Sequence, residues 1–144
     1  MLTGYSFNGK NNNKNIKQSS LQKKIEKILF SLVKTGLYEA IYLYNDDGLP
    51  LVDNQPFAKI SKVDPVEISI MMSQIRKTIS GLDDLGNINE IVIEGANGKK
   101  IVFRYISLFE QTTTLIATIP AGKYYRNMTN KLQRTLIQLC EMEN

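Results

Sequence analysis

Side chains that usually carry out catalysis are scarce in this chain. Histidine, the commonest general base and metal ligand, is absent, and Cys140 is the single cysteine. The adjacent aspartates Asp46 and Asp47 could suggest a cation site. A Ca²⁺ loop, however, needs about six or more oxygen ligands at set positions, and apolar residues follow this turn directly. The residue types therefore predict no metal site.

Other signatures of an enzyme are missing as well. No phosphate-cradling glycine loop precedes a predicted helix, and the carboxylates are not clustered along the chain. Cys140 lies near the end of the last predicted helix, where a packing or partly exposed thiol is expected rather than a nucleophile. We therefore expect no catalytic residues, no cofactor and no enzymatic activity.

Charge is divided unevenly along the chain, whose formal net charge is +4 at pH 7. Residues 1–34 hold seven lysines and one acid, a net charge of +6, and the rest holds eleven basic and thirteen acidic groups, a net charge of −2. A nucleic-acid-binding domain would carry a basic face on its folded body, so we expect no nucleic acid as a partner. The lysine-rich segment is interpreted as a solvated tail, with contact to an acidic protein or an anionic membrane as the alternative.

The length of 144 residues fits one domain that can bury a substantial core. No apolar run reaches the roughly 20 residues of a membrane-spanning helix, and the N-terminus lacks the apolar block of a secretory signal, so we expect a cytoplasmic protein. Residues 1–18 are rich in Asn, Lys, Ser and Gly. They are predicted to be disordered, and residues 19–144 to form the domain.

The clearest predicted element is a helix over residues 64–82. Asp64 suits the N-cap, Pro65 suits the first helical position, and Glu67 completes a spacing like that of a capping box. Helical periodicity places six apolar residues within one arc of roughly 100°, which predicts the stripe that faces the core. These residues are Ile68, Met71, Met72, Ile75, Ile79 and Leu82. Val66 and Ile70 lie on the opposite side with Ser69, Ser73 and Lys77, and form a second, smaller apolar patch.

Two further helices and five strands are expected from pattern and turn chemistry. The first helix begins at Ser19 or Ser20 and ends near Gly36, and the last carries apolar residues from Tyr125 to Leu139. Strands are predicted over residues 37–44, 49–53, 88–94, 99–108 and 113–119. The element order α-β-β-α-β-β-β-α with short hairpin links predicts an α+β fold. It would be a three-layer α/β/α sandwich around a five-stranded, mostly antiparallel sheet.

The strand over residues 88–94 has the mixed pattern of a sheet edge. Ile91 and Ile93 alternate with Glu90, Val92 and Glu94. An unpaired edge can accept a strand from a second copy of the chain, and the same association could bury the second apolar patch of the helix over residues 64–82. The sequence therefore predicts self-association.

Three stretches of the chain carry a family resemblance. They are IEKILFSLVKTGLYEAIYLYNDDGLPLV before the long helix, EIVIEGANGKKIVFRY after it, and TLIATIPAGKYYRNMTNKLQRTLIQL near the C-terminus. With the helix between them, these stretches resemble the Roadblock family of dynein light-chain-like domains, which includes small bacterial and archaeal GTPase regulators. The resemblance covers residues 20–142, and the N-terminal segment departs from the family pattern.

The resemblance implies a dimer, with a second copy or another Roadblock-type chain, that acts as an adaptor or regulator of a small Ras-like GTPase. Carried over by position, the implied dimer interface consists of Val66, Ile70, Ser73, Lys77, Glu90, Ile91, Val92 and Ile93. Ser69, Ser73 and Arg76 are the candidate residues for docking the GTPase. A solvated helix surface is the other interpretation of these three.

The alternative function is a ligand-sensing or purely structural signalling module. It would use a pocket between sheet and helix near Tyr42, Tyr44 and Phe103. The same aromatic residues also fit the core of a sheet covered on both faces, so the sequence leaves both interpretations open.

Overall fold

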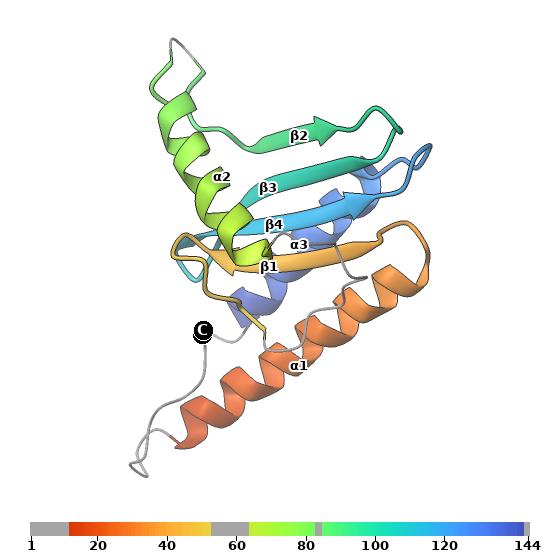
Figure 1. Ribbon diagram of the computed structural model, residues 1–144. Coiled ribbons are helices and arrows are strands. Elements are labelled where there is room, and N and C mark those ends of the chain that lie inside the picture. The colour runs from red at the N-terminus through yellow and green to blue at the C-terminus, as the bar shows by residue number, and fades with distance from the viewer. Residues whose placement is uncertain (1–11, 53–63, 83–84, 143–144) are drawn as a thin grey trace.

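The computed structural model describes residues 12–52, 64–82 and 85–142 (Figure 1). Its elements in chain order are α1 (Asn12–Lys34), β1 (Ala40–Asn45), α2 (Pro65–Ile79), β2 (Glu90–Glu94), β3 (Lys100–Leu108), β4 (Gln111–Ile119) and α3 (Arg126–Met142). The four strands form one sheet in the order β1-β4-β3-β2, and every neighbouring pair is antiparallel. The fold is thus α+β with an antiparallel sheet, as predicted.

Helices cover both faces of this sheet. Figure 1 shows α1 and α3 on one side and α2 on the other. The alternation in β1 explains how both faces are filled: Ile41 and Leu43 join the core under α1 and α3, whereas Tyr42 and Tyr44 join the core under α2. Strand β1 is therefore buried on both sides, which is the arrangement its dense apolar pattern predicted.

The predicted fifth strand is not confirmed. After the turn at Gly48, the chain makes a single bridge between Tyr44 and Pro50. Two hydrogen bonds form it: the Asn45 amide donates to the Leu49 carbonyl over 2.9 Å, and the Leu51 amide donates to the Leu43 carbonyl over 3.0 Å. No second bridge follows between β1 and this segment among the described residues, so the segment is not a strand. Asp53, the predicted end of the strand, lies outside the described residues.

Helix α1 is longer than predicted. It begins at Asn12 rather than at Ser19 or Ser20, so residues 12–18, which were predicted to be disordered, belong to the helix. Residues 1–11 of the predicted disordered segment lie outside the described residues. Composition underestimated this element because a polar helix can extend from a part whose apolar side chains are anchored in the core.

The edge position of β2 is confirmed. It pairs on one side with β3, in a register that places Ile91 opposite Phe103 and Ile93 opposite Ile101. The connecting turn contains Gly98 at φ +84°, a conformation that favours glycine. The other edge of β2 has no neighbouring strand among the described residues.

A candidate interaction surface on the second helix

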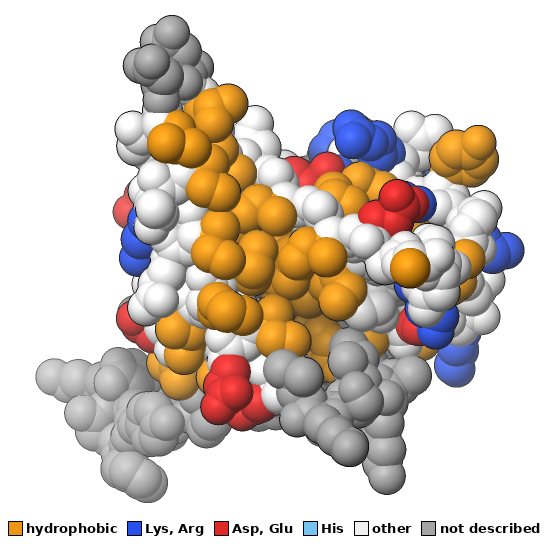
Figure 2. Space-filling view, turned by 45° about the horizontal axis from the view of Figure 1, so that its top comes forward, with side chains coloured by type: hydrophobic (Ala, Val, Ile, Leu, Met, Phe, Trp, Pro, Cys, Tyr) orange, Lys and Arg blue, Asp and Glu red, His pale blue; other side chains and the backbone are white. Residues whose placement is uncertain are grey.

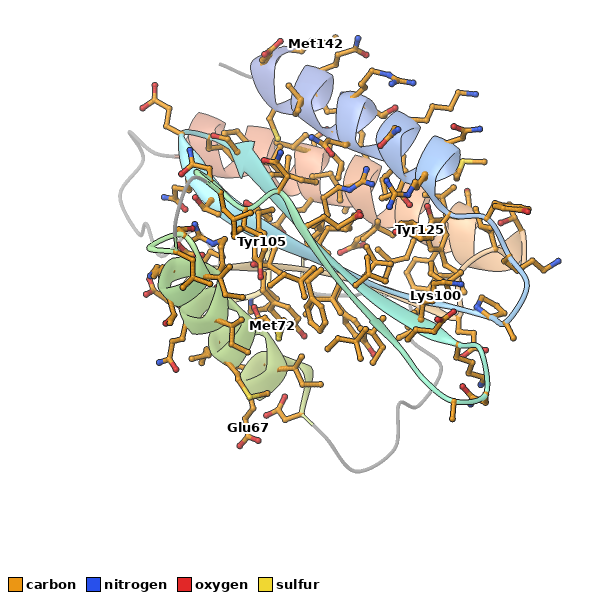
Figure 3. All side chains as sticks on the ribbon, turned by 90° about the horizontal axis from the view of Figure 1, so that it is seen from above. Glu67, Met72, Lys100, Tyr105, Tyr125 and Met142 are labelled. Atoms are coloured by element: carbon orange, nitrogen blue, oxygen red, sulfur yellow. The ribbon has the colours of Figure 1, made fainter. Side chains whose placement is uncertain are left out.

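Helix α2 begins as its sequence predicted. The Asp64 side chain accepts a hydrogen bond of 3.0 Å from the Val66 amide, and Pro65 occupies the first turn. The helix then crosses β1 and β4. Met72 points from it toward the sheet, and Glu67 points away (Figure 3).

The side of α2 that contacts the sheet overlaps the predicted one only in part: Ile68, Met72 and Ile75 of the predicted stripe pack in the core under the helix. Ser69, Met72 and Ser73 are the side chains buried there, with exposed fractions of 0%, 3% and 2%. Of these three, only Met72 belongs to the predicted core stripe. The two serines, expected on a docking face, are instead enclosed in the fold, where small side chains let the helix approach the sheet closely.

A polar cluster attaches this side of α2 to the turn after β1. Ser73 Oγ donates to Asp46 Oδ1 over 3.2 Å, and Arg76 Nη2 lies 3.2 Å from Asp46 Oδ2. The Arg76 guanidinium also stacks over the Tyr105 ring, 5.1 Å from its centroid, and the Tyr105 hydroxyl donates to the Met72 carbonyl over 3.0 Å. Arg76, predicted to dock a partner, therefore serves to hold α2 on the sheet.

Burial also alters the acidity of Tyr105. Its half-buried position raises the pKa of the phenol to about 12, with smaller opposing effects from the nearby Arg76 and Asp46 charges. The hydroxyl consequently stays protonated at neutral pH and can keep donating to the Met72 carbonyl. The cluster is a structural clamp whose charges are already paired.

Turning the serines inward leaves much of the apolar stripe of α2 uncovered. Met71 is 51% exposed and Leu82, just past the helix end, is 60% exposed, while Ile68 and Ile75 are half-buried. The open half of the sheet continues this surface with Ile91, Ile93 and Ile101, which strand alternation places on the same face. Figure 2 shows a continuous hydrophobic patch along α2 and onto the sheet. We call these seven residues the α2 platform.

Other residues of the implied dimer interface lie apart from the platform. Val66 and Ile70 pack on the turn after β1, where a Cβ added to Gly48 would lie 2.8 Å from Ile70 Cγ1. Lys77 is exposed on that same side, with its Nζ 4.0 Å from Asp46. Val92 is exposed on β2 but alternates onto the opposite sheet face from Ile91 and Ile93.

Glu90 is engaged inside the protein. Its Oε1 accepts bonds from Arg104 Nη2 and Nε over 2.8 and 3.0 Å, and its Oε2 accepts one from the Tyr125 hydroxyl over 3.3 Å. The Arg104 guanidinium also donates to Asn130 Oδ1 over 2.6 Å. This cluster links the edge hairpin to α3, and the Glu90 carboxylate is already bonded within the protein.

The aromatic residues of the alternative function lie in the core. Tyr42, Tyr44 and Phe103 are buried and pack with Met72 and Ile116. They fill the space between the sheet and α2 in which a ligand pocket was envisaged. A ligand-sensing role stays an untested prediction.

The described residues hold no group of three or more metal-ligating side chains. In the same part of the chain, no helix is long and apolar enough to cross a membrane. Cys140 is buried, and its burial raises the pKa of the thiol to about 11, so the thiol stays protonated and weakly nucleophilic at neutral pH.

Several solved structures share this arrangement of helices and sheet. The gliding protein MglB of Thermus thermophilus aligns over 85% of this chain and 93% of its own, with a TM-score of 0.67 and 12% identity. MglB in a tetrameric arrangement aligns over 87% and 93%, with a TM-score of 0.67 and 11% identity. A Roadblock/LC7 domain from Streptomyces avermitilis aligns over 81% and 92%, with a TM-score of 0.52 and 14% identity.

The chain has the Roadblock fold. No protein-family model and no curated protein sequence matches it, so the likeness is one of structure. The α2 platform therefore lies on the central helix and the edge strand of a Roadblock fold.

Proposed function

We propose that this chain is a dimeric, non-enzymatic adaptor or regulator of a small Ras-like GTPase. The observation that carries the proposal is the α2 platform, a continuous apolar surface on one helix and the neighbouring sheet. Apolar patches of this kind are typical of protein interfaces. The Roadblock fold and the tetrameric arrangement of MglB support self-association and, through the family resemblance, a GTPase partner.

In the proposed dimer, α2 meets α2 and the free edge of β2 meets β2 of the second chain. Met71, Ile75 and Ile93 would be buried at the centre, while Val92 contributes from the edge strand and Ile70 and Lys77 lie at the rim. Association removes apolar surface from water at about 25 cal/mol per Å² and satisfies the free edge. The two paired helices would then form the surface on which the GTPase docks.

The interface is tested by size-exclusion chromatography with light scattering at tens of micromolar protein. The wild type is expected to be a dimer, and Met71→Asp a monomer, because the charge would be buried in the interface. Gln74→Asp, exposed on α2 outside the platform, is the matched control and should remain dimeric. A monomeric wild type would show that the proposed interface does not form. Dissociation by Ile70→Asp but not by Met71→Asp would place the interface on another side of α2.

The partner is tested by a pull-down from native lysate, scored for small GTPases in both nucleotide states and followed by hydrolysis rates with the purified pair. Binding to a GTPase in one nucleotide state, lost in Met71→Asp, is the expected result. An unchanged rate of GTP hydrolysis would indicate tethering, and a faster rate a GTPase-activating partner. Recovery of no GTPase in either state would favour the ligand-sensing or purely structural alternative.

A further inference from the structure

Helix α1 carries a lysine-rich outer face on the side of the sheet opposite the α2 platform. Lys23, Lys27 and Lys34 are spaced so that they share one side of the helix. Phe30 lies between them and is 44% exposed, although most large apolar residues of α1 are packed in the core. These residues line one shallow hollow along the helix, together with Ser20, Lys24, Glu26 and Ser31, so that four lysines and one acid border it. We call Lys23, Lys27, Phe30 and Lys34 the α1 lysine face.

Positive charge is concentrated in the helix layer that α1 and α3 form. Helix α1 contains six lysines and one acid, and α3, in the same layer, contains three basic residues and one acid, so the two helices hold a net +7. The other described residues hold six basic and eight acidic side chains, a net −2. Lys131 and Arg134, both exposed on α3, extend the positive side beyond α1.

We propose that the α1 lysine face binds the anionic surface of a phospholipid membrane. Lysine clusters gain affinity from such surfaces by long-range attraction, and a single apolar residue among them can enter the headgroup region. With 23 residues, α1 is about 34 Å long and presents a rod that can lie along a flat surface. None of the side chains of the α1 lysine face requires a pocket in the binding partner.

An acidic protein is the other surface that could attract these charges, and the residue types favour the membrane. All six cations of α1 are lysines and none is arginine. Arginine's planar fork matches individual carboxylates in protein interfaces, whereas lysine acts as a hydrated point charge suited to a diffuse field. A protein interface would also be expected to enclose more than one apolar residue.

The position of α1 relative to α2 determines where the α1 lysine faces would lie in the proposed dimer. This inference rests on the proposed function. If β2 strands pair edge to edge and both α2 helices meet, the twofold axis is perpendicular to the sheet. Both α1 helices then lie on the opposite face, as the placement of α1 and α2 in Figures 1 and 3 indicates. A membrane-bound dimer would thus use two α1 lysine faces and present its platform to solution.

Vesicle flotation with the full chain tests the proposal. The protein is expected to bind vesicles of phosphatidylcholine and phosphatidylserine at low salt and to dissociate from them as the salt concentration is raised. It should not bind vesicles of phosphatidylcholine alone. Neutralising Lys23, Lys27 and Lys34 to Gln should weaken binding about a hundredfold. Phe30→Ser should weaken vesicle binding about tenfold, because the variant lacks the apolar ring that would move from water into the headgroup region.

The matched control neutralises three other lysines, which lie outside helix α1 and outside the proposed dimer interface, to Gln: Lys99, Lys100 and Lys123. It has the same net charge and should keep near wild-type binding. Equal loss in both triple variants, or no binding to anionic vesicles at low salt, overturns the proposal. Stronger binding to poly-glutamate than to vesicles, unaffected by Phe30→Ser, overturns it in favour of an acidic protein. Unchanged melting temperatures establish that all variants are folded.

These experiments distinguish failure of the membrane proposal from failure of the dimer or GTPase proposal. Met71→Asp, outside the α1 lysine face, should weaken flotation by removing the second copy but should not abolish it. Loss of flotation with an intact dimer would refute the membrane proposal alone. Flotation that persists in a monomer would refute only the dimer.

Discussion

The Ser73 hydroxyl donates a hydrogen bond of 3.2 Å to the Asp46 carboxylate and so joins α2 to the turn after β1. The two residues are 27 positions apart in sequence. Their contact turns the serine side of α2 inward, and because a helix has one orientation at a time, Met71 on another side is left exposed. An internal polar contact thereby helps to determine which apolar side of α2 is exposed.

Removing the Asp46 carboxylate is expected to loosen α2. Asp46→Ala deprives Ser73 of its acceptor and leaves the largely buried Arg76 without its carboxylate partner. We expect a loss of about 1 to 2 kcal/mol in the free energy of unfolding, measured by urea denaturation at fixed protein concentration. Asp47→Ala, in the same turn but exposed, is the control. Equal losses in both variants would show that the turn itself, and not the contact with α2, matters.

Gly48 is expected to tolerate a side chain worse than other glycines with the same backbone conformation. Its φ is +80°, and an added Cβ would lie 2.8 Å from Ile70 Cγ1. Gly122 has φ +78° and open space around the same position. Gly122→Ala should cost about 1 kcal/mol from the backbone alone, and Gly48→Ala about 1 to 3 kcal/mol more. Thermal unfolding compares the two, and similar costs would mean that α2 shifts freely to accommodate the methyl group.

Breaking the Glu90–Arg104 pair is expected to destabilise the edge hairpin strongly. Arg104 is 8% exposed, so Glu90→Ala leaves a largely buried guanidinium without its carboxylate. The free energy of unfolding should fall by about 2 to 4 kcal/mol. Glu94→Ala removes the exposed pair with Lys100 and should cost less than about 1 kcal/mol. Chemical denaturation measures both, and a small effect of Glu90→Ala would show that water replaces the carboxylate.

Alkaline pH is expected to destabilise the fold through its buried tyrosines. Burial, with smaller contributions from Tyr42 and Asp64, raises the pKa of Tyr44 from 10.0 to about 12. Between these values the unfolded chain has released the proton and the folded one has kept it, so stability falls as pH rises from about 10 to 12. Below pH 10 the contribution is fully present.

Tyr44→Phe should reduce this alkaline loss by up to about 3 kcal/mol, because the variant has no phenol to titrate there. Urea denaturation at several pH values between about 8 and 11.5 measures the slope. Tyr124→Phe, at a side chain that is 95% exposed, should leave the slope unchanged. The same slope in Tyr44→Phe and wild type would mean that other groups govern alkaline unfolding.

Local chemistry in the sequence predicted much of the fold. The Asp64 cap, the alternation of β1 and the edge character of β2 were all foreseen, because each depends on residues close in sequence. The predictions failed where segments that are distant in sequence come together in the fold. The fifth strand was expected from turn chemistry, but the structure has only a single bridge there, and the start of α1 was placed too late.

The sequence likewise predicted only part of the candidate surface. Ile91 and Ile93, named for the implied interface, are half-buried and exposed on β2. Glu90 pairs with Arg104, Ser69 and Ser73 are buried, and Arg76 is half-buried against Asp46. Periodicity identified the apolar stripe of α2 without indicating what covers it. The pair Ser69 and Ser73, one helical turn apart, was the signal available for close helix–sheet contact.

The sequence by itself determined three helices and four of the five predicted strands, the two-sided pattern of β1 and the lysine-rich character of α1, since propensity, capping and periodicity act over a few residues. Only the tertiary structure decided which side of α2 meets the sheet. That choice depends on Asp46, Ser73, Arg76 and Tyr105 coming together from separate elements. Their contacts exist only once the chain has folded, and they leave Met71 and Ile93 facing solvent.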